Sequence, residues 1–296
     1  MRSRIAKLAR HRRKSVQATQ GGESGMTGFS VDWLNLREAA DQQARNSELL
    51  GVAAAFAASG GDAQAIVVDL GAGTGSTYRT FGQHGFSAKF TSTWRLVDND
   101  RELLGEAARR ADQNRRIETY ELDLNQVAQL PLTSVRLITA SALFDLVSVL
   151  FIDRLIAEVD KASSGRPVGI YAALNYDGST CWDPVHPLDQ QVLEAFNEDQ
   201  TTDKGFGPAL GPDACNYVKQ ALEQAGFGVR LATSPWQLEG KDSQLVTELI
   251  QGIGRAVQSR PQITREYITD WLAFRLAHVT TGSCRVGHTD LLAVRE

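Results

Sequence analysis

The chain has 296 residues, of which 42% are hydrophobic, enough to bury a sizeable core in one α/β domain with additional segments. No apolar run reaches 18 residues, which argues against a transmembrane helix. The net charge is −4, yet residues 1–14 hold seven Lys or Arg and no acid, which leaves −11 for the remainder. Such an acidic body disfavours nucleic acid as a partner, because phosphate contacts need clustered cations.

The basic start of the chain and the Gly-, Ser-, Thr- and Gln-rich stretch after it predict a disordered tail over 1–28. Two other interpretations stay open. Met26 is an alternative start, and an Arg-rich, acid-free leader is typical of organellar presequences. Otherwise we expect a cytoplasmic protein, because three distant cysteines favour a reducing compartment. No Cys or His pair has ligand spacing, so no metal is expected.

The folded part is predicted to begin with one or two helices over 31–57 that cover a sheet. Ile66, Val67 and Val68 then form a short buried strand, which Asp69 follows directly. Three glycines spaced G-x-G-x-G come next, at Gly71, Gly73 and Gly75, before Ser76 can start a helix. A strand, a glycine turn and a helix start allow backbone to approach a ligand closely, which points to a nucleotide-like cofactor.

The glycine spacing favours one cofactor over another. The dinucleotide fingerprint is G-x-G-x-x-G, and an acid before the first glycine is awkward beside a pyrophosphate but suits an ammonium group. The run D-L-G-A-G-T-G-S at 69–76 resembles motif I of the class I S-adenosylmethionine-dependent methyltransferases. The resemblance implies S-adenosylmethionine as cofactor. It also implies that the following residues bind it: Asp69, Gly71, Ala72, Gly73 and Gly75.

A second strand over 94–98 ends in Asp98, which lies 23 residues beyond Gly75. An acid about 20 residues past the glycine turn of a βαβ unit meets the ribose hydroxyls, and the resemblance implies this role for Asp98 with Asn99 beside it. Asp100 is better suited to cap the next helix.

A third strand near 117–122 ends before Asp123 and Leu124, which the resemblance places at the adenine. The alternative is an ordinary turn, where Asp is common. A fourth strand is predicted over 136–142, and the resemblance implies that Ser141 at its end lies near the methionine portion of the cofactor. Ser141 also suits a cap for a helix beginning at 143, and the two roles can coexist.

The remaining elements complete an alternating pattern of strands and helices. A strand is predicted at 167–174, a long loop at 175–209, a helix at 212–225 and a strand at 228–236. Two amphipathic helices near 245–257 and 267–274 and a strand at 284–294 follow. This predicts a doubly wound, mostly parallel seven-stranded sheet of the Rossmann-like methyltransferase type. One domain over 29–296 would hold a cofactor core (64–174), substrate loops (175–212) and a helical insert (240–280). The resemblance implies that the last strand runs antiparallel beside the sixth. The insert could pack on the sheet, form a lid or mediate a homodimer.

Ligands of open α/β sheets bind at the carboxyl ends of the strands, so the loop after the fifth strand is the substrate candidate. Its candidate substrate contacts are Asn175, Tyr176 and Trp182, and its candidate bases for a hydroxyl acceptor are His186 and Asp177. Each has a structural alternative. Asp177 and Gly178 resemble a common turn, Trp182 suits core packing, and His186 before a proline could bond its own loop.

The function expected from these features is methyl transfer from S-adenosylmethionine to an unidentified small-molecule acceptor by in-line displacement. Two alternatives stay open. One is a non-catalytic S-adenosylmethionine-binding protein with a regulatory or assembly role, and the other is a nucleotide-dependent oxidoreductase.

Overall fold

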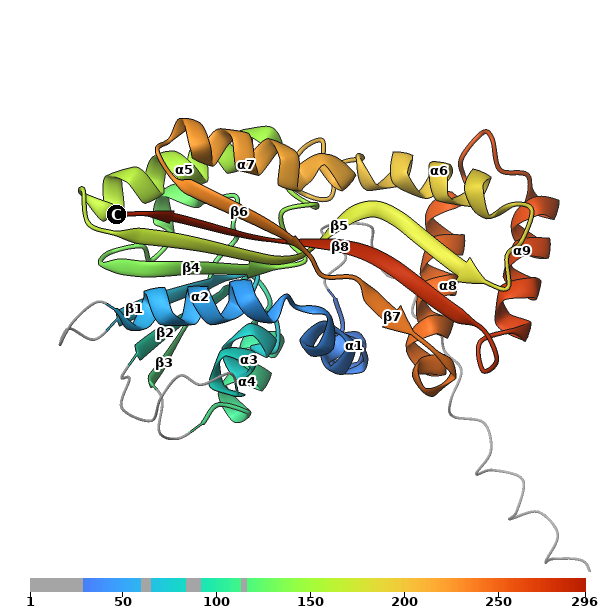
Figure 1. Ribbon diagram of the computed structural model, residues 1–296, viewed down its shortest axis with the longest axis horizontal. Helices are drawn as coiled ribbons and strands as arrows, with labels where there is room; N and C mark the ends of the chain where they lie inside the picture. Colours follow the sequence, from blue (N-terminus) through green and yellow to red (C-terminus); the bar gives the residue numbers. More distant parts are fainter. Residues whose placement is uncertain (1–28, 60–64, 84–91, 113–115) are drawn as a thin grey trace, which may run out of the picture.

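One sheet runs through the centre of the molecule, with helices on both of its faces (Figure 1). The computed structural model describes residues 29–59, 65–83, 92–112 and 116–296, so the predicted basic tail lies outside the described residues. The strands are β1 (Ala65–Leu70), β2 (Ser92–Asp98), β3 (Arg116–Glu121), β4 (Val135–Ser141), β5 (Val168–Asp183), β6 (Gly228–Thr233), β7 (Trp236–Leu238) and β8 (Ser283–Arg295). The helices are α1 (Val31–Ala44), α2 (Ser47–Ala58), α3 (Ser76–Gln83), α4 (Arg101–Arg109), α5 (Val149–Ser163), α6 (Asp189–Gln200), α7 (Ala214–Gln224), α8 (Ser243–Val257) and α9 (Arg265–Ala277).

The strand order is β3-β2-β1-β4-β5-β8-β6, and β7 pairs with β8 beyond this path. Strands β1 to β5 are parallel, whereas β8 is antiparallel to β5, β6 and β7. The predicted doubly wound, mostly parallel fold is confirmed, including the antiparallel pairing of the last strand with β6. The eighth strand arises because the segment predicted as one strand over 228–236 is interrupted at Ser234 and Pro235.

The central strands are apolar along their length because helices bury both of their faces. Successive residues of β1 face opposite sides, with Val67 packing among α2, α3 and α4 and Val68 packing among α5 and α7. This burial holds the carboxyl ends of β1, β2 and β4 at one edge of the sheet, where the site lies.

Strands β5 and β8 continue past the core as a long antiparallel ribbon (Figure 1). The prediction of a long loop over 175–209 is therefore wrong, because the region holds the second half of β5 and all of α6. Turn-forming residues 177–179 suggested a loop, but they form an irregularity in β5, after which pairing resumes at Thr180. The insert helices α8 and α9 pack with α6 on this ribbon, in a group that we call the helical lobe.

The start of helix α5 differs from the sequence prediction. Helix α5 begins at Val149 rather than at 143, and Ser148 caps it through the amide of Phe151 at 3.3 Å. Ser141 is thus free of a capping role.

Among the residues that the structure describes, no helix has the length and apolar character that a membrane crossing requires.

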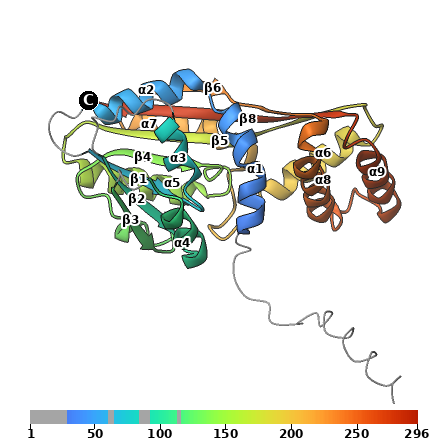
Figure 2. The same cartoon turned by 90° about the horizontal axis from the view of Figure 1, so that it is seen from below.

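Helix α1 lies between the sheet core and the helical lobe (Figure 2). It packs against β7 and α8 on one side, and its other contacts reach the glycine turn after β1. One helix therefore borders both the turn and the ribbon.

Candidate active site

The glycine turn follows β1 directly and leads into α3. Gly71, Gly73 and Gly75 have φ values of +62°, +51° and +80°, a region in which a Cβ is strained. A Cβ built on Gly73 would lie 3.0 Å from Cδ1 of Leu34 on α1. Only glycine therefore gives this turn its shape, and α1 lies directly against it.

Asp98 closes the turn from the end of β2. Its Oδ2 accepts a hydrogen bond from the Gly73 amide at 2.8 Å, and its Oδ1 accepts one from the Asp100 amide at 3.0 Å. Burial raises the pKa of Asp98, while these amide hydrogen bonds oppose the rise. Each carboxylate oxygen keeps a second lone pair for a ligand hydroxyl. Next to it, Asn99 is exposed, and Ala72 is buried with its amide bonded to the Val97 carbonyl at 3.0 Å.

Asp69, at the end of β1, is an incompletely paired buried acid. It is 1% exposed, and its Oδ1 accepts a hydrogen bond from the Thr139 hydroxyl at 2.7 Å. Its Oδ2 has no hydrogen bond in the described part of the chain. Burial raises the pKa of Asp69 to about 7, against the lowering effects of Thr139 and of the Arg45 charge. A cationic group on a ligand would satisfy the second oxygen.

Arg45, the residue after α1, is a buried guanidinium with unused donors. Its Nη2 donates to the hydroxyls of Thr77 at 3.2 Å and Ser141 at 2.9 Å. Its Nε and Nη1 have no hydrogen-bond partner among the described residues, although the side chain is buried. Arg45 and Asp69 thus present unpaired donors and an unpaired acceptor in one buried region, an arrangement suited to a zwitterion.

Asp123 and Leu124 lie after β3, as predicted. Asp123 Oδ1 accepts from the amide and the side-chain nitrogen of Asn125, at 2.9 and 3.1 Å, so the carboxylate forms a turn. Leu124 is buried, with Cδ1 4.0 Å from a Cβ built on Gly71. Leu124 is therefore at the glycine turn, and an adenine contact by Asp123 stays a prediction.

Replacing Asp69 by Asn is expected to remove a pH dependence of stability. The Asp69 carboxyl ionises near pH 4 when unfolded and near pH 7 when folded, so the native state retains its proton between these values. The free energy of unfolding of the wild type should then fall by up to about 4 kcal/mol, relative to the variant, as pH rises from 4 to 7. Urea denaturation of both proteins across this range measures the difference. Parallel curves would show that Asp69 is not held protonated.

A second buried polar group lies beyond the glycine turn, on the side of the helical lobe. We call it the Asp145 cluster, and it consists of Arg37, Asp41, Asp145, Tyr176, Trp236 and His288. Arg37 pairs with Asp41 through two hydrogen bonds of 2.9 and 3.2 Å, and the Trp236 indole donates to Asp41 at 3.0 Å. Oδ1 of Asp145 and Nδ1 of His288 have no hydrogen bond among the described residues.

The other candidate residues on β5 have structural partners. The Asn175 side chain accepts from the Phe144 amide and donates to the Thr289 carbonyl, each at 3.2 Å, so it ties the loop after β4 to β5 and β8. Asp177 accepts from the amide and hydroxyl of Ser179, at 2.9 and 2.6 Å, and lies over Gly287. Asp177 therefore forms the common turn that was its alternative interpretation, and we do not propose it as a base.

His186 and Trp182 belong to the helical lobe and are not brought to the glycine turn. His186 accepts from the Leu188 amide at 3.3 Å and lies 3.4 Å from Asp270 of α9, so its ring holds a loop. Trp182 packs edge-on against Trp271 and under the guanidinium of Arg275. Neither residue is placed to contact a cofactor at the turn, and the structural alternative holds for both.

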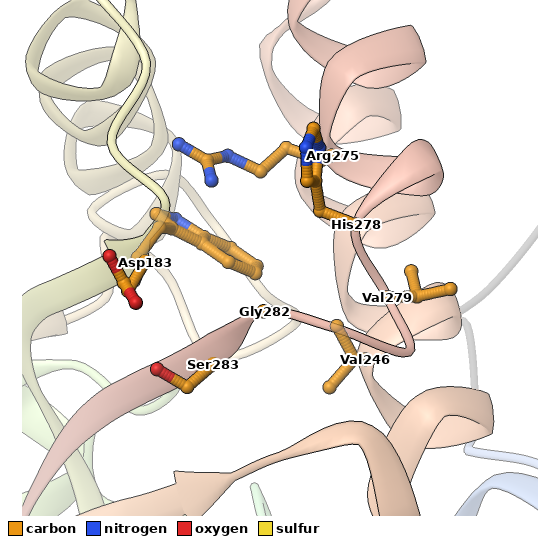
Figure 3. Close-up of a pocket in the computed structure, with 8 residues that line it drawn as sticks. Asp183, Val246, Arg275, His278, Val279, Gly282 and Ser283 are labelled. Atoms are coloured by element: carbon orange, nitrogen blue, oxygen red, sulfur yellow. The ribbon is translucent and has the colours of Figure 1, made fainter.

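Trp182 also lines a small pocket of the helical lobe (Figure 3). Arg275 and His278 border it from α9 and its end, and Asp183 borders it from β5. Its volume is about 10 Å³, room for about one water molecule rather than a substrate. The acceptor is therefore not expected in this pocket.

No protein-family model and no curated protein matches the sequence. Among solved structures, mycolic acid cyclopropane synthase CmaA1 complexed with SAH and CTAB is similar over 92% of this chain and 90% of its own. The sequence identity is 12% and the TM-score is 0.50. The chain has the class I methyltransferase fold.

Two further solved structures are similar at lower TM-scores. Magnesium protoporphyrin IX methyltransferase (ChlM) from Synechocystis PCC 6803 with bound SAH covers 93% of this chain and 90% of its own, at 16% identity and a TM-score of 0.46. Cyclopropane synthase MmaA2 from Mycobacterium tuberculosis covers 83% of this chain and 82% of its own, at 12% identity and a TM-score of 0.47. The assignment of the methyltransferase fold does not depend on them.

Sequence reasoning missed four residues at the centre of this methyltransferase fold, namely Arg37, Arg45, Asp145 and His288. A signal for the first two exists in the spacing of Arg37, Asp41 and Arg45, which puts alternating charges on one face of α1. That face was interpreted only as a cover for the sheet. No comparable signal marks His288, which becomes buried only when β8 joins β5 and β7.

Proposed function

We propose that the protein transfers a methyl group from S-adenosylmethionine to a small-molecule acceptor by in-line displacement. One observation carries the proposal, namely the unpaired Oδ2 of Asp69 and the unpaired Nε and Nη1 of Arg45 beside the glycine turn. The amino-acid end of S-adenosylmethionine has an ammonium group for the first and a carboxylate for the second.

The other residues at the edge of the sheet fit the rest of this cofactor. Asp98 has lone pairs for two ribose hydroxyls, and Asp123 with Leu124 is available for the adenine. Support also comes from CmaA1, the solved structure at a TM-score of 0.50, which is complexed with SAH. An NAD site is less well matched, because Asp69 stands where a pyrophosphate would bring negative charge.

The contribution of this chain to the reaction is mainly positioning. When bound, the sulfonium supplies an already activated methyl group. Holding the two reactants in line is worth about 7–11 kcal/mol, whereas a general base adds about 10²–10⁴-fold, or roughly 3–5 kcal/mol. The turn and Asp98 fix one reactant, and burial under α1 excludes water from it.

Two measurements test the proposal in sequence. Isothermal titration should show binding of S-adenosylhomocysteine and no binding of NADH, and the reverse result would establish a nucleotide-dependent oxidoreductase instead. Incubation with methyl-labelled S-adenosylmethionine and a fractionated metabolite extract should then label one small molecule. Tight cofactor binding without any labelled product would identify a non-catalytic binding protein.

Asp98→Ala is expected to weaken S-adenosylhomocysteine binding by about 1.5–3 kcal/mol, the range for hydrogen bonds to a charged group. The loss arises because the ribose hydroxyls and the Gly73 amide lose a common acceptor. Calorimetric titration measures it. Asp100→Ala is the control, because Asp100 caps α4 through the amides of Glu102 and Leu103 and should lower stability without lowering affinity. Equal affinities for wild type and Asp98→Ala would count against the ribose role.

A further inference from the structure

The loop between β4 and α5 presents a buried acid that the cofactor site does not use. Asp145 is 7% exposed, and its Oδ1 lacks a hydrogen bond among the described residues. The loop itself is firmly held. The Gly211 amide donates to the Asp145 carbonyl at 2.9 Å, and the Leu210 amide donates to the Val147 carbonyl at 2.8 Å. A fixed, buried and unpaired carboxylate oxygen lowers the free energy of unfolding unless a ligand donates a hydrogen bond to it.

This acid is connected to the glycine turn through the same loop. Leu143, two residues before Asp145, lies 3.6 Å from a Cβ built on Gly71, and Ser141 accepts a hydrogen bond from Arg45. Asp145 therefore follows the cofactor contacts along one short segment, on the side of the helical lobe.

His288 of β8 provides a second unpaired group nearby. It is 6% exposed, pairs with Tyr176 across the ribbon, and its ring centre lies 5.1 Å from that of Trp236. Burial lowers the pKa of His288 to about 3, so the ring is neutral. Its Nδ1 has no hydrogen bond among the described residues, so this ring nitrogen is available to a ligand. The backbone of Tyr176 also lowers the pKa of Asp145, so β5 faces this acid.

The charges that face Asp145 favour a ligand with hydrogen-bond donors. Arg37 lowers the pKa of both Asp145 and His288, but Asp41 already pairs with it. Burial raises the pKa of the Cys215 thiol on α7 to about 12. Burial also raises the pKa of the Tyr176 phenol to about 12, so both groups are neutral. The only cation that a ligand carboxylate or phosphate would meet is Arg37, which Asp41 already pairs, whereas an amine or hydroxyl would meet an unpaired carboxylate oxygen and an unpaired imidazole nitrogen.

We propose that Asp145 is the catalytic base of the reaction and that, with His288, it selects an acceptor whose nucleophile is an amine or a hydroxyl. The inference rests on the proposed methyl transfer. The lone pair of the acceptor nitrogen or oxygen forms the bond to the methyl carbon, and the electron pair of the broken carbon–sulfur bond stays on sulfur. The proton leaving the acceptor goes to Oδ1 of Asp145. Burial raises the pKa of Asp145 to about 6, close to the value at which a base is ionised yet effective at neutral pH.

The test compares wild type with Asp145→Asn, using methyl-labelled S-adenosylmethionine and the small-molecule fraction of a cell extract as probes. We expect the variant to bind S-adenosylhomocysteine within threefold of wild type and to transfer methyl 10²–10⁴-fold more slowly. Asp160→Asn is the matched control, because its carboxylate is 69% exposed on α5. Transfer by Asp145→Asn within tenfold of wild type would overturn the assignment.

Two readouts keep the test independent of how well the variant folds. The wild-type rate should fall as pH drops through about 6, because protonated Asp145 cannot take a proton. The labelled product of wild type should be an N-methylamine or a methyl ether, and a methyl ester, thioether or C-methyl product would overturn the inference. Failure of wild type to bind S-adenosylhomocysteine would instead overturn the proposed function itself.

Discussion

Gly73→Val is expected to abolish S-adenosylhomocysteine binding, by more than 100-fold in affinity, while the chain stays folded. Gly73 has φ +51°, which a β-branched residue adopts only with strain of about 1–2 kcal/mol. Its new Cβ would lie 3.0 Å from Leu34 Cδ1, and the two methyl groups would crowd the turn at which we propose that backbone meets the cofactor. Calorimetric titration measures the affinity, and thermal unfolding measures the cost to stability.

Gly165→Val separates backbone strain from loss of the site. Gly165 has φ +77°, and no atom lies within 4 Å of a Cβ built on it. The Gly165→Val variant should therefore lose about as much stability as Gly73→Val and bind S-adenosylhomocysteine normally. Should Gly73→Val titrate like wild type, the turn does not hold the cofactor. Should both variants lose binding together, the loss reports instability rather than a blocked site.

Arg45→Met is expected to lower the affinity for S-adenosylhomocysteine by about 10–100-fold, because a charge-assisted hydrogen bond to a carboxylate is worth about 1.5–3 kcal/mol. Met retains the aliphatic length of the side chain and removes the donors that Nε and Nη1 leave unused. The affinity for 5′-methylthioadenosine, which lacks the amino-acid end, should not change. Titration of both compounds into both proteins measures this difference directly.

The matched control is Arg95→Met, another largely buried arginine, on β2. Its Nη1 donates to the main-chain carbonyls of Pro131 and Thr133, at 2.6 and 2.8 Å, away from the turn. It should leave both affinities unchanged. An equal loss for the two compounds in Arg45→Met would mean that Arg45 supports the fold and does not recognise a carboxylate.

The parts of the fold that were predictable from sequence are those set by neighbouring residues. The run 66–76 carries its own strand, turn and helix start, and Asp98 is placed by the length of one βα unit. The helix predicted over 212–225 ends where expected, because Gly226, with φ +84°, follows α7. Local chemistry therefore sufficed for the order of the elements and for the glycine turn.

The parts that escaped prediction depend on contacts between distant segments. Arg45 reaches Ser141, and His288 is buried against Trp236 and Tyr176 only through the pairing of β8 with β5 and β7. No pattern within one segment reveals such contacts. The residues 177–179 were misleading for the opposite reason, because their local turn chemistry is real but occurs within a strand.

The position of β8 has a consequence for how the chain reaches its native state. β8 lies between β5 and β6, and its Asp290, which is fully buried, accepts from the Leu174 and Asn46 amides at 2.8 and 2.9 Å. During synthesis, the sheet therefore stays open until residues 283–295 have left the ribosome, although the glycine turn is made some 200 residues earlier. From the synthesis of β5 until then, β5 and later β6 expose unpaired edges, so we expect the nascent chain to be prone to edge-to-edge association in the later part of its translation.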